Sequence, residues 1–404
     1  MTGILDNPAA LGGGKTENTR QRSLFLCLPS RIILNESGTS FFISQERRLH
    51  RFETADGERH YGFRFEKTGF AWLKNLLMKN YLKKIEIQVR DISACRLYVE
   101  DAVKLVFFSM FRHRINSSIL EHIYGSPMLR AWNRANPKKS ISPDMKISNK
   151  SFRELLESRM PGRIEELKKE LLHKIIQRIP RAAIEAREDP RDIHNFVREL
   201  IGDLRSLIFF VLAGSRGEDR AALVQNISRV IIESIHRFDI LNLASFLTIE
   251  LVAAAERSSL VRMLGTADDV KSILESPQRR KSIMEEKRFR GATVVLALPP
   301  EIPQGSRRLR FRLSVYNDGA DLEAERKLME DFTERSYTFK DGRHLEELFR
   351  ASKSGRGVYE DNGMSFYYLT ILREQCGKNN IFLDASVKNS HSEKSVVTTL
   401  WFGV

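Results

Sequence analysis

The stretch Ala292-Thr-Val-Val-Leu-Ala-Leu298 and the stretch Leu309-Arg-Phe-Arg-Leu-Ser-Val315, joined by a Pro/Gly turn, decide the fold of the last third of the chain. In the second stretch, apolar residues alternate with arginines and a serine, which is typical of a strand with one buried face. A turn composition follows at Tyr316-Asn317-Asp318-Gly319-Ala320-Asp321. The two stretches predict a hairpin of strands that ends in a polar turn.

Two helices and two further strands are expected around this hairpin. An apolar helix is expected over Asn242–Ser258, and a second over Tyr367–Gln375, which opens at Glu360-Asp361-Asn362-Gly363-Met364-Ser365-Phe366. The last strands are expected at Asn380–Val387 and Ser395–Phe402. We expect the four strands to form one mixed sheet with both helices on one face.

This order of elements resembles the ATP-binding domain of histidine kinases, gyrase B and the heat-shock-90 chaperones, the GHKL ATPases. In that family a strand leads to Asp-x-Gly-x-Gly, whose Asp reads the adenine amino group, and a lid follows. A second glycine-rich box opens a helix whose N-terminal amides face the phosphates, and a hairpin closes the domain. The resemblance covers roughly residues 242–402 and implies an α/β sandwich of the GHKL type over residues 242–404.

The resemblance also implies a nucleotide site. Glu250-Leu251 matches the family's N-box, Glu-Leu-x-x-Asn-Ala, in which the Glu orients water and the Asn ligates Mg²⁺. The strand-end turn matches the adenine-reading box, and Gly363 matches the second glycine-rich box. The implied cofactor-binding residues are Glu250, Asn317, Asp318, Gly319 and Gly363.

The positions that do chemistry in the family differ here. The metal-binding Asn is Ala254, which supplies no oxygen ligand, and the adenine-reading carboxylate is the amide Asn317. The second glycine of the adenine box is Asp321, whose charge would repel a phosphate, and Ser365 replaces a glycine of the second box. We therefore expect no catalytic residue, no metal ligand, and either no cofactor or weakly bound Mg-ATP.

Residues 151–241 read as a helical domain. Helices over Arg191–Ala213 and Asp219–Phe238 predict an antiparallel hairpin. Gly202-Asp-Leu-Arg-Ser-Leu207 resembles the phosphoacceptor box of the histidine-kinase dimerisation hairpin, with Gly202 in the place of the His. The run Ile208-Phe-Phe-Val211 is apolar all round, which favours a homodimer. The alternative is that the helix Arg163–Ile179 covers it within the chain.

The N-terminal part reads as a separate α+β domain over residues 22–132, after a disordered tail at residues 1–20 and before a linker at residues 133–150. The strand Ile85–Val89, the turn Asp91-Ile-Ser93 and the following helix resemble the STAS regulatory fold. Arg112-His113-Arg114 is interpreted as a solvated basic spot at a helix end. The expected fold class is therefore α+β, with an N-terminal α+β domain, a central helical hairpin or bundle, and a C-terminal sandwich.

Composition limits the partners. The chain of 404 residues holds 66 Lys and Arg against 52 Asp and Glu, a net charge of +14. Because both signs are interspersed, a basic surface is favoured over a nucleic-acid scaffold. Cys27, Cys95 and Cys376 lie far apart, which fits a reducing cytoplasm. No signal peptide and no run of about 20 apolar residues is present, so we expect a cytoplasmic protein without a membrane span.

Three functions stay open. The first is a signalling pseudokinase of the two-component type that acts by binding a protein, such as one resembling a response regulator. The second is an active histidine kinase or ATPase with shifted ligands, with Asp318 reading adenine and Glu250 holding the metal. The third is a nucleic-acid-associated basic protein, which the charge alone supports.

Overall fold

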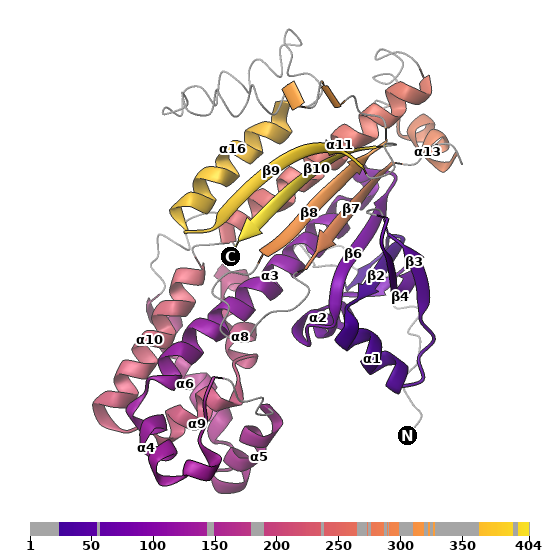
Figure 1. The fold of residues 1–404 in the computed structure, drawn as a ribbon. Helices are drawn as coiled ribbons and strands as arrows, with labels where there is room; N and C mark the ends of the chain where they lie inside the picture. Colours follow the sequence, from indigo (N-terminus) through magenta and orange to yellow (C-terminus); the bar gives the residue numbers. More distant parts are fainter. Residues whose placement is uncertain are drawn as a thin grey trace, which may run out of the picture.

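The computed structural model is a mixed helix and sheet protein, as the α+β fold class predicted (Figure 1). It describes residues 24–54, 57–143, 149–178, 190–235, 238–264, 273, 276–286, 289, 291–298, 310–318, 322–323, 326–327, 363–390 and 395–403. The expected tail at residues 1–20, Gly319, Asp321 and the expected helix start at residues 360–362 lie outside these residues.

An eight-stranded sheet runs through the molecule in the order β3-β4-β2-β6-β7-β8-β10-β9. Its strands are β2 (Ser30–Leu34), β3 (His50–Glu53), β4 (Arg59–Phe65), β6 (Leu82–Val89), β7 (Ala292–Ala297), β8 (Arg310–Asn317), β9 (Phe382–Asn389) and β10 (Val396–Gly403). The four strands expected in the last third are therefore neighbours, but every pair in the sheet is antiparallel, so the expectation of a mixed sheet was wrong. A separate two-stranded sheet pairs β1 (Phe25–Leu26) with β5 (Thr68–Gly69).

The N-terminal and C-terminal strands share this sheet. β6 pairs with β7 over six residue pairs, from Lys84 opposite Ala297 to Val89 opposite Ala292. Residues 22–132 and 242–404 were expected as separate domains, whereas here they complete a single sheet. The sequence between them forms a helical insertion, because the strands on its two sides are hydrogen-bonded to each other.

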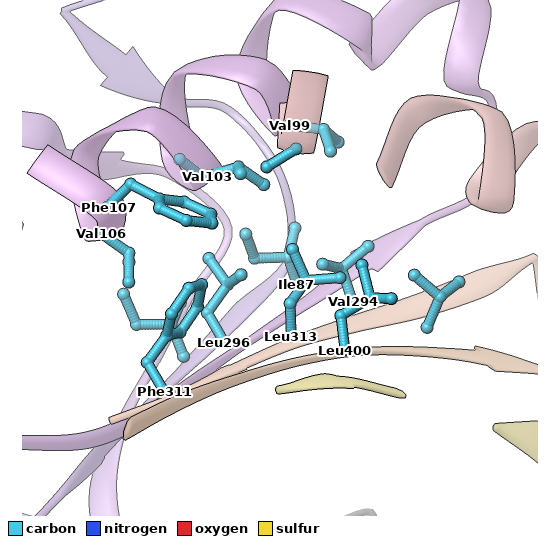
Figure 2. Packing of buried hydrophobic residues seen from close by; sticks show 14 of the residues in the cluster. Ile87, Val99, Val103, Val106, Phe107, Val294, Leu296, Phe311, Leu313 and Leu400 are labelled. Atoms are coloured by element: carbon cyan, nitrogen blue, oxygen red, sulfur yellow. The ribbon is translucent and has the colours of Figure 1, made fainter. Parts of the chain in front are cut away.

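Helices cover one face of the sheet. They are α2 (Phe70–Met78), α3 (Ile92–Tyr124), α11 (Phe238–Leu264) and α16 (Gly363–Lys378), while α1 (Glu36–Ser44) lies beside β2 and α13 (Pro277–Glu285) lies at the end of α11. Figure 2 shows Val99, Val103 and Phe107 of α3 above inward side chains of the strands, such as Leu313 and Leu400. The alternating stretch around β8 therefore buries the apolar face that its sequence predicts.

α3 links the sheet to a helical bundle. Its 33 residues correspond to a length of about 50 Å. Side chains from Ile92 to Phe111 belong to the core beneath the sheet, whereas those from Ile115 to Ile123 belong to the core of the bundle. The bundle contains α4 (Pro127–Ala135), the short 3₁₀ helix η1 (Pro137–Lys139), α5 (Asn149–Arg159), α6 (Arg163–Arg178), α8 (Pro190–Gly202), α9 (Ser206–Gly214) and α10 (Gly217–Ile235).

The bundle differs from the expected helical hairpin. Its first helix is split into α8 and α9, and every side chain from Ser206 to Leu212 in α9 is buried within the chain. The helices α5, α6, α10 and α3 all contact α9, so the covering that the alternative assigned to the helix from Arg163 is present. The apolar run at Ile208 therefore no longer argues for a dimer.

The expected linker at 133–150 contains ordered structure where it is described. The side chain of Asn133 accepts a hydrogen bond from the amide of Ile141 at 2.7 Å and donates one to its carbonyl at 2.9 Å. Ile141 is 5% exposed and joins the bundle core. This segment therefore folds back on α4 instead of separating two domains.

Candidate functional site

Glu250 lies on α11 at the seam with α16. It is half-buried, and Phe246, one turn earlier, packs near Tyr368 of α16 with 6.1 Å between ring centroids. Burial raises the pKa of the Tyr368 hydroxyl, the charge of Glu250 raises it further, and Arg96 of α3 opposes them. Three helices thus bring Glu250, Tyr368 and Arg96 into one charged cluster.

Asn317 is the last residue of β8, and it is 8% exposed between Ala292 of β7 and Val396 of β10. It lies on the same sheet face as Val315, because side chains two residues apart in a strand share a face. Asp318 follows in a turn, and its carbonyl accepts a hydrogen bond from the guanidinium of Arg262 in the last turn of α11. The end of β8 is therefore tied to the C-terminal end of α11.

Gly363 is the first residue of α16, where backbone amides have no partners inside the helix. α11 contacts both α16 and β8, so the elements carrying Glu250, Asn317, Asp318 and Gly363 are neighbours. However, Glu250 and Arg262 are twelve residues apart on one helix, which is about 18 Å. The candidate residues therefore lie along α11 and not around a single point.

Ala254, which the resemblance to the GHKL ATPases aligns with a metal-binding Asn, lies on this helix one turn after Glu250. It is 5% exposed, and its methyl group offers no oxygen to a cation. Within the described residues, no three His, Cys, Asp or Glu side chains gather closely enough to hold a metal ion.

A buried acid that sequence reasoning did not single out lies further along α11. Glu256 is 3% exposed. It accepts a hydrogen bond of 2.8 Å from the amide of Ile92 and pairs with Arg280 of α13. Burial raises the pKa of Glu256 to about 7, against the opposing effects of the Ile92 amide and Arg280. The same arginine lies 3.0 Å from Asp91, which caps α3, so one cation joins α13 to α3 and α11.

Local sequence gives little warning of this cluster. The one available signal is a Glu within the apolar run of α11, directly before Arg257. Its partners come from segments far away in the chain, namely the start of α3 and α13. Cys95, one turn into α3, is affected as well: burial raises its pKa to about 11, with contributions from Asp91 and Glu256.

The basic spot at Arg112 is buried, so its interpretation as a solvated surface was wrong. Arg112 lies in the middle of α3, is 1% exposed and pairs with Asp203 between α8 and α9. It also donates to the carbonyl of Glu199 at 3.2 Å, near the end of α8. Burial lowers the pKa of Arg112 to about 10. Asn116, one turn later, accepts a hydrogen bond of 3.2 Å from the amide of Arg205, at the start of α9.

The segment that resembles a phosphoacceptor box therefore makes a break between two helices. Gly202 ends α8, Asp203 pairs with Arg112, and Arg205 precedes α9. Polar side chains of α3 satisfy backbone groups at both helix ends, as helix termini require. The polar residues of this box are explained by the helix break.

None of the described helices has both the length and the apolar composition that a bilayer crossing requires. The chain is distantly similar to an uncharacterized protein of Treponema pallidum (strain Nichols). It is 18% identical over 386 residues, which cover 92% of this chain and 95% of the relative. No solved structure matches the chain. A model described as "Family of unknown function (DUF8084)" matches residues 21–404, and the chain therefore belongs to the DUF8084 family.

Proposed function

We propose that this chain is a regulatory protein that acts by binding another protein, and that its C-terminal half is a degenerate module of the histidine-kinase-like ATPase type. The arrangement of the last third supports the proposal. α11 packs against both β8 and α16, and the hairpin of β9 and β10 closes the sheet next to β8. The sequence order behind the resemblance thus corresponds to elements that are neighbours in space.

The main support for the proposed loss of ATPase activity is the buried Ala254. An active GHKL ATPase needs an oxygen ligand for Mg²⁺ at this helix position. Here the side chain is the methyl group of Ala254, which is 5% exposed. The strand end offers the amide of Asn317 in place of a carboxylate. Each missing interaction with a charged group costs about 1–3 kcal/mol, and two such losses weaken binding roughly a hundredfold or more. Binding of Mg-ATP is then too weak to support turnover.

Calorimetric titration of the full chain with Mg-ATP tests this proposal. The unmodified protein should give no saturable heat below millimolar nucleotide, and it should not phosphorylate itself. The triple variant Asn317→Asp, Asp321→Gly and Ala254→Asn should gain measurable affinity. Asn389→Asp, at the exposed end of β9, is a control for the Asn317→Asp substitution, because it introduces the same single negative charge on another strand. Melting curves show whether each variant is folded.

A different result would favour the active alternative. If the unmodified chain binds Mg-ATP tightly, and Asp318→Ala and Glu250→Gln each abolish that binding, then shifted ligands hold a working nucleotide site. The backbone contact between Asp318 and Arg262 does not depend on the Asp318 side chain, so this variant tests the carboxylate alone.

A further inference from the structure

One face of the eight-stranded sheet lies outside the main core cluster, although Ile33, Lys84, Glu86 and Val295 at its centre are buried. The strand residues of the core cluster, such as Ile87, Leu313 and Leu400, all point to the face that α2, α3, α11 and α16 cover. In Figure 1 the strands β8, β9 and β10 are seen with α11 behind them. We call the opposite side the outer face, and its residues alternate with those of the core.

The outer face carries basic and aromatic side chains. The strand register places the following charged residues there: Arg31, Arg64, Lys84, Arg310, Arg312 and Lys388, against Glu86 and Asp384. It places these aromatic residues there: Phe52, Tyr316, Phe382 and Trp401. Lys84 and Glu86 are buried at the centre of this face. The exposed charges are therefore four basic residues, Arg31, Arg64, Arg310 and Lys388, and one acid, Asp384, while Arg312 is half-buried.

One exposed part of this face lies over β8, β10 and β9. Trp401 is 39% exposed and Phe382 is 64% exposed, although large aromatic side chains are usually buried. The guanidinium of Arg312 lies 5.3 Å from the centre of the Trp401 ring. Phe382 lies opposite Gly403, where an added Cβ would come within 3.1 Å of the Phe382 Cβ. Arg310 and Lys388 are exposed on the same face.

A second group of the same chemistry lies over β2, β3 and β4. Arg31 and Arg64 are directly opposite each other and both are exposed. The guanidinium of Arg31 lies 5.7 Å from the centre of the Phe52 ring. The buried Glu86 lies 3.6 Å from Arg31, so one of the two acids on this face already has a basic partner.

We propose that the outer face binds single-stranded nucleic acid, with bases stacking on Trp401 and Phe382 and the backbone phosphates contacting Arg310, Arg312 and Lys388. Exposed aromatic residues on a sheet, flanked by cations, suit unpaired bases of any sequence. A duplex fits poorly, because an eight-stranded sheet is broader than a major groove of about 12 Å. A protein partner is disfavoured, because Arg310 and Arg312 of β8 lie beside the two exposed aromatics and Asp384 lies opposite Trp401, which leaves no continuous apolar centre. This inference does not depend on the proposed loss of ATPase activity.

Fluorescence anisotropy with labelled dT20, the matching RNA and a 20-base-pair duplex, in about 50 mM salt, tests the proposal on the full chain. We expect micromolar binding of the single strands and weaker binding of the duplex. Trp401→Ala and Phe382→Ala should each weaken single-strand binding about 5- to 150-fold, the range for one lost stacking partner. Trp401→Phe keeps a stacking ring and should recover most of the affinity.

Variants that remove basic residues provide a second measurement, the salt dependence of binding. Arg310→Gln with Lys388→Gln should reduce the salt slope of log K by about 1.4, because single strands lose about 0.7 per phosphate contact. The matched control is Lys169→Gln with Lys281→Gln, two exposed lysines on α6 and α13. Tyr61→Ala, 46% exposed on the other face of the sheet, is the aromatic control. Undetectable single-strand binding would overturn the proposal, and so would equal losses in the control and outer-face variants.

Discussion

Ile87 of β6 lies directly opposite Val294 of β7, and both side chains are fully buried beneath α3. This pair lies where the N-terminal strands meet the C-terminal strands. Without the other half, either set of strands would expose a central strand whose backbone groups have no partner. The two halves are therefore expected to depend on each other for stability.

Truncating Val294 tests this dependence. Val294→Ala should lower the free energy of unfolding by about 2–4 kcal/mol, because it removes two buried methyl groups and leaves a cavity. Hydrogen exchange should show amides of β2 and β8 losing protection together. Thr293→Ala, on the opposite face of the same strand, should cost less than about 1 kcal/mol. Loss of protection in the C-terminal strands alone would mean that the halves unfold independently.

Glu256 should make stability depend on pH. Its folded pKa of about 7 lies above the ordinary value of 4.5, so the folded chain holds a proton that the unfolded chain releases. The free energy of unfolding should therefore fall as pH rises from about 4.5 to about 7, by up to about 3 kcal/mol. The charged and titratable groups that face Glu256 are Asp91, Cys95, Arg257 and Arg280.

Urea titrations between pH 5 and pH 8 measure this effect, with Glu256→Gln as the comparison. The variant keeps an acceptor for the Ile92 amide but cannot ionise. Its free energy of unfolding should therefore change less between pH 5 and pH 8 than that of the parent. An unchanged pH profile in the variant would assign the titration to another group.

Asp203 should contribute more to the free energy of unfolding than its partial exposure indicates. Asp203→Ala leaves the buried guanidinium of Arg112 without its acid, and such uncompensated charges cost about 3–5 kcal/mol. The double variant Arg112→Met with Asp203→Ala should recover much of that loss, because no unpaired charge is left. Thermal unfolding of the single and double variants measures the difference, and a single variant as stable as the parent would contradict the pairing.

The variant Phe209→Ala tests whether α9 belongs to the core of the bundle or to a dimer interface. It is 1% exposed within the chain, so Phe209→Ala should cost about 3–5 kcal/mol in unfolding free energy. Light scattering should give the same mass before and after the change. If the parent is a dimer and the variant is a stable monomer, then α9 contributes to contacts between chains.

Local patterns in the sequence determined much of the C-terminal half. The alternation from Leu309 to Val315 predicted β8 and its buried face, because strand periodicity is written in neighbouring residues. The strands β7, β9 and β10 and the helices α11 and α16 followed from similar signals, with boundaries a few residues off. Glu250, Asn317 and Gly363 could be assigned to neighbouring elements, because helix and strand order limits which ends can meet.

Tertiary structure decided which strands pair and which charged side chains meet. The pairing of β6 with β7 could not be read from the sequence, because any strand edge offers the same backbone donors and acceptors to any other. The burial of Arg112 and of Glu256 depends on partners from distant segments, Asp203 and Arg280. From sequence alone, a charged residue with no partner nearby in the chain is predicted to be exposed to solvent. Only the folded chain supplies the counter-charge that allows its burial.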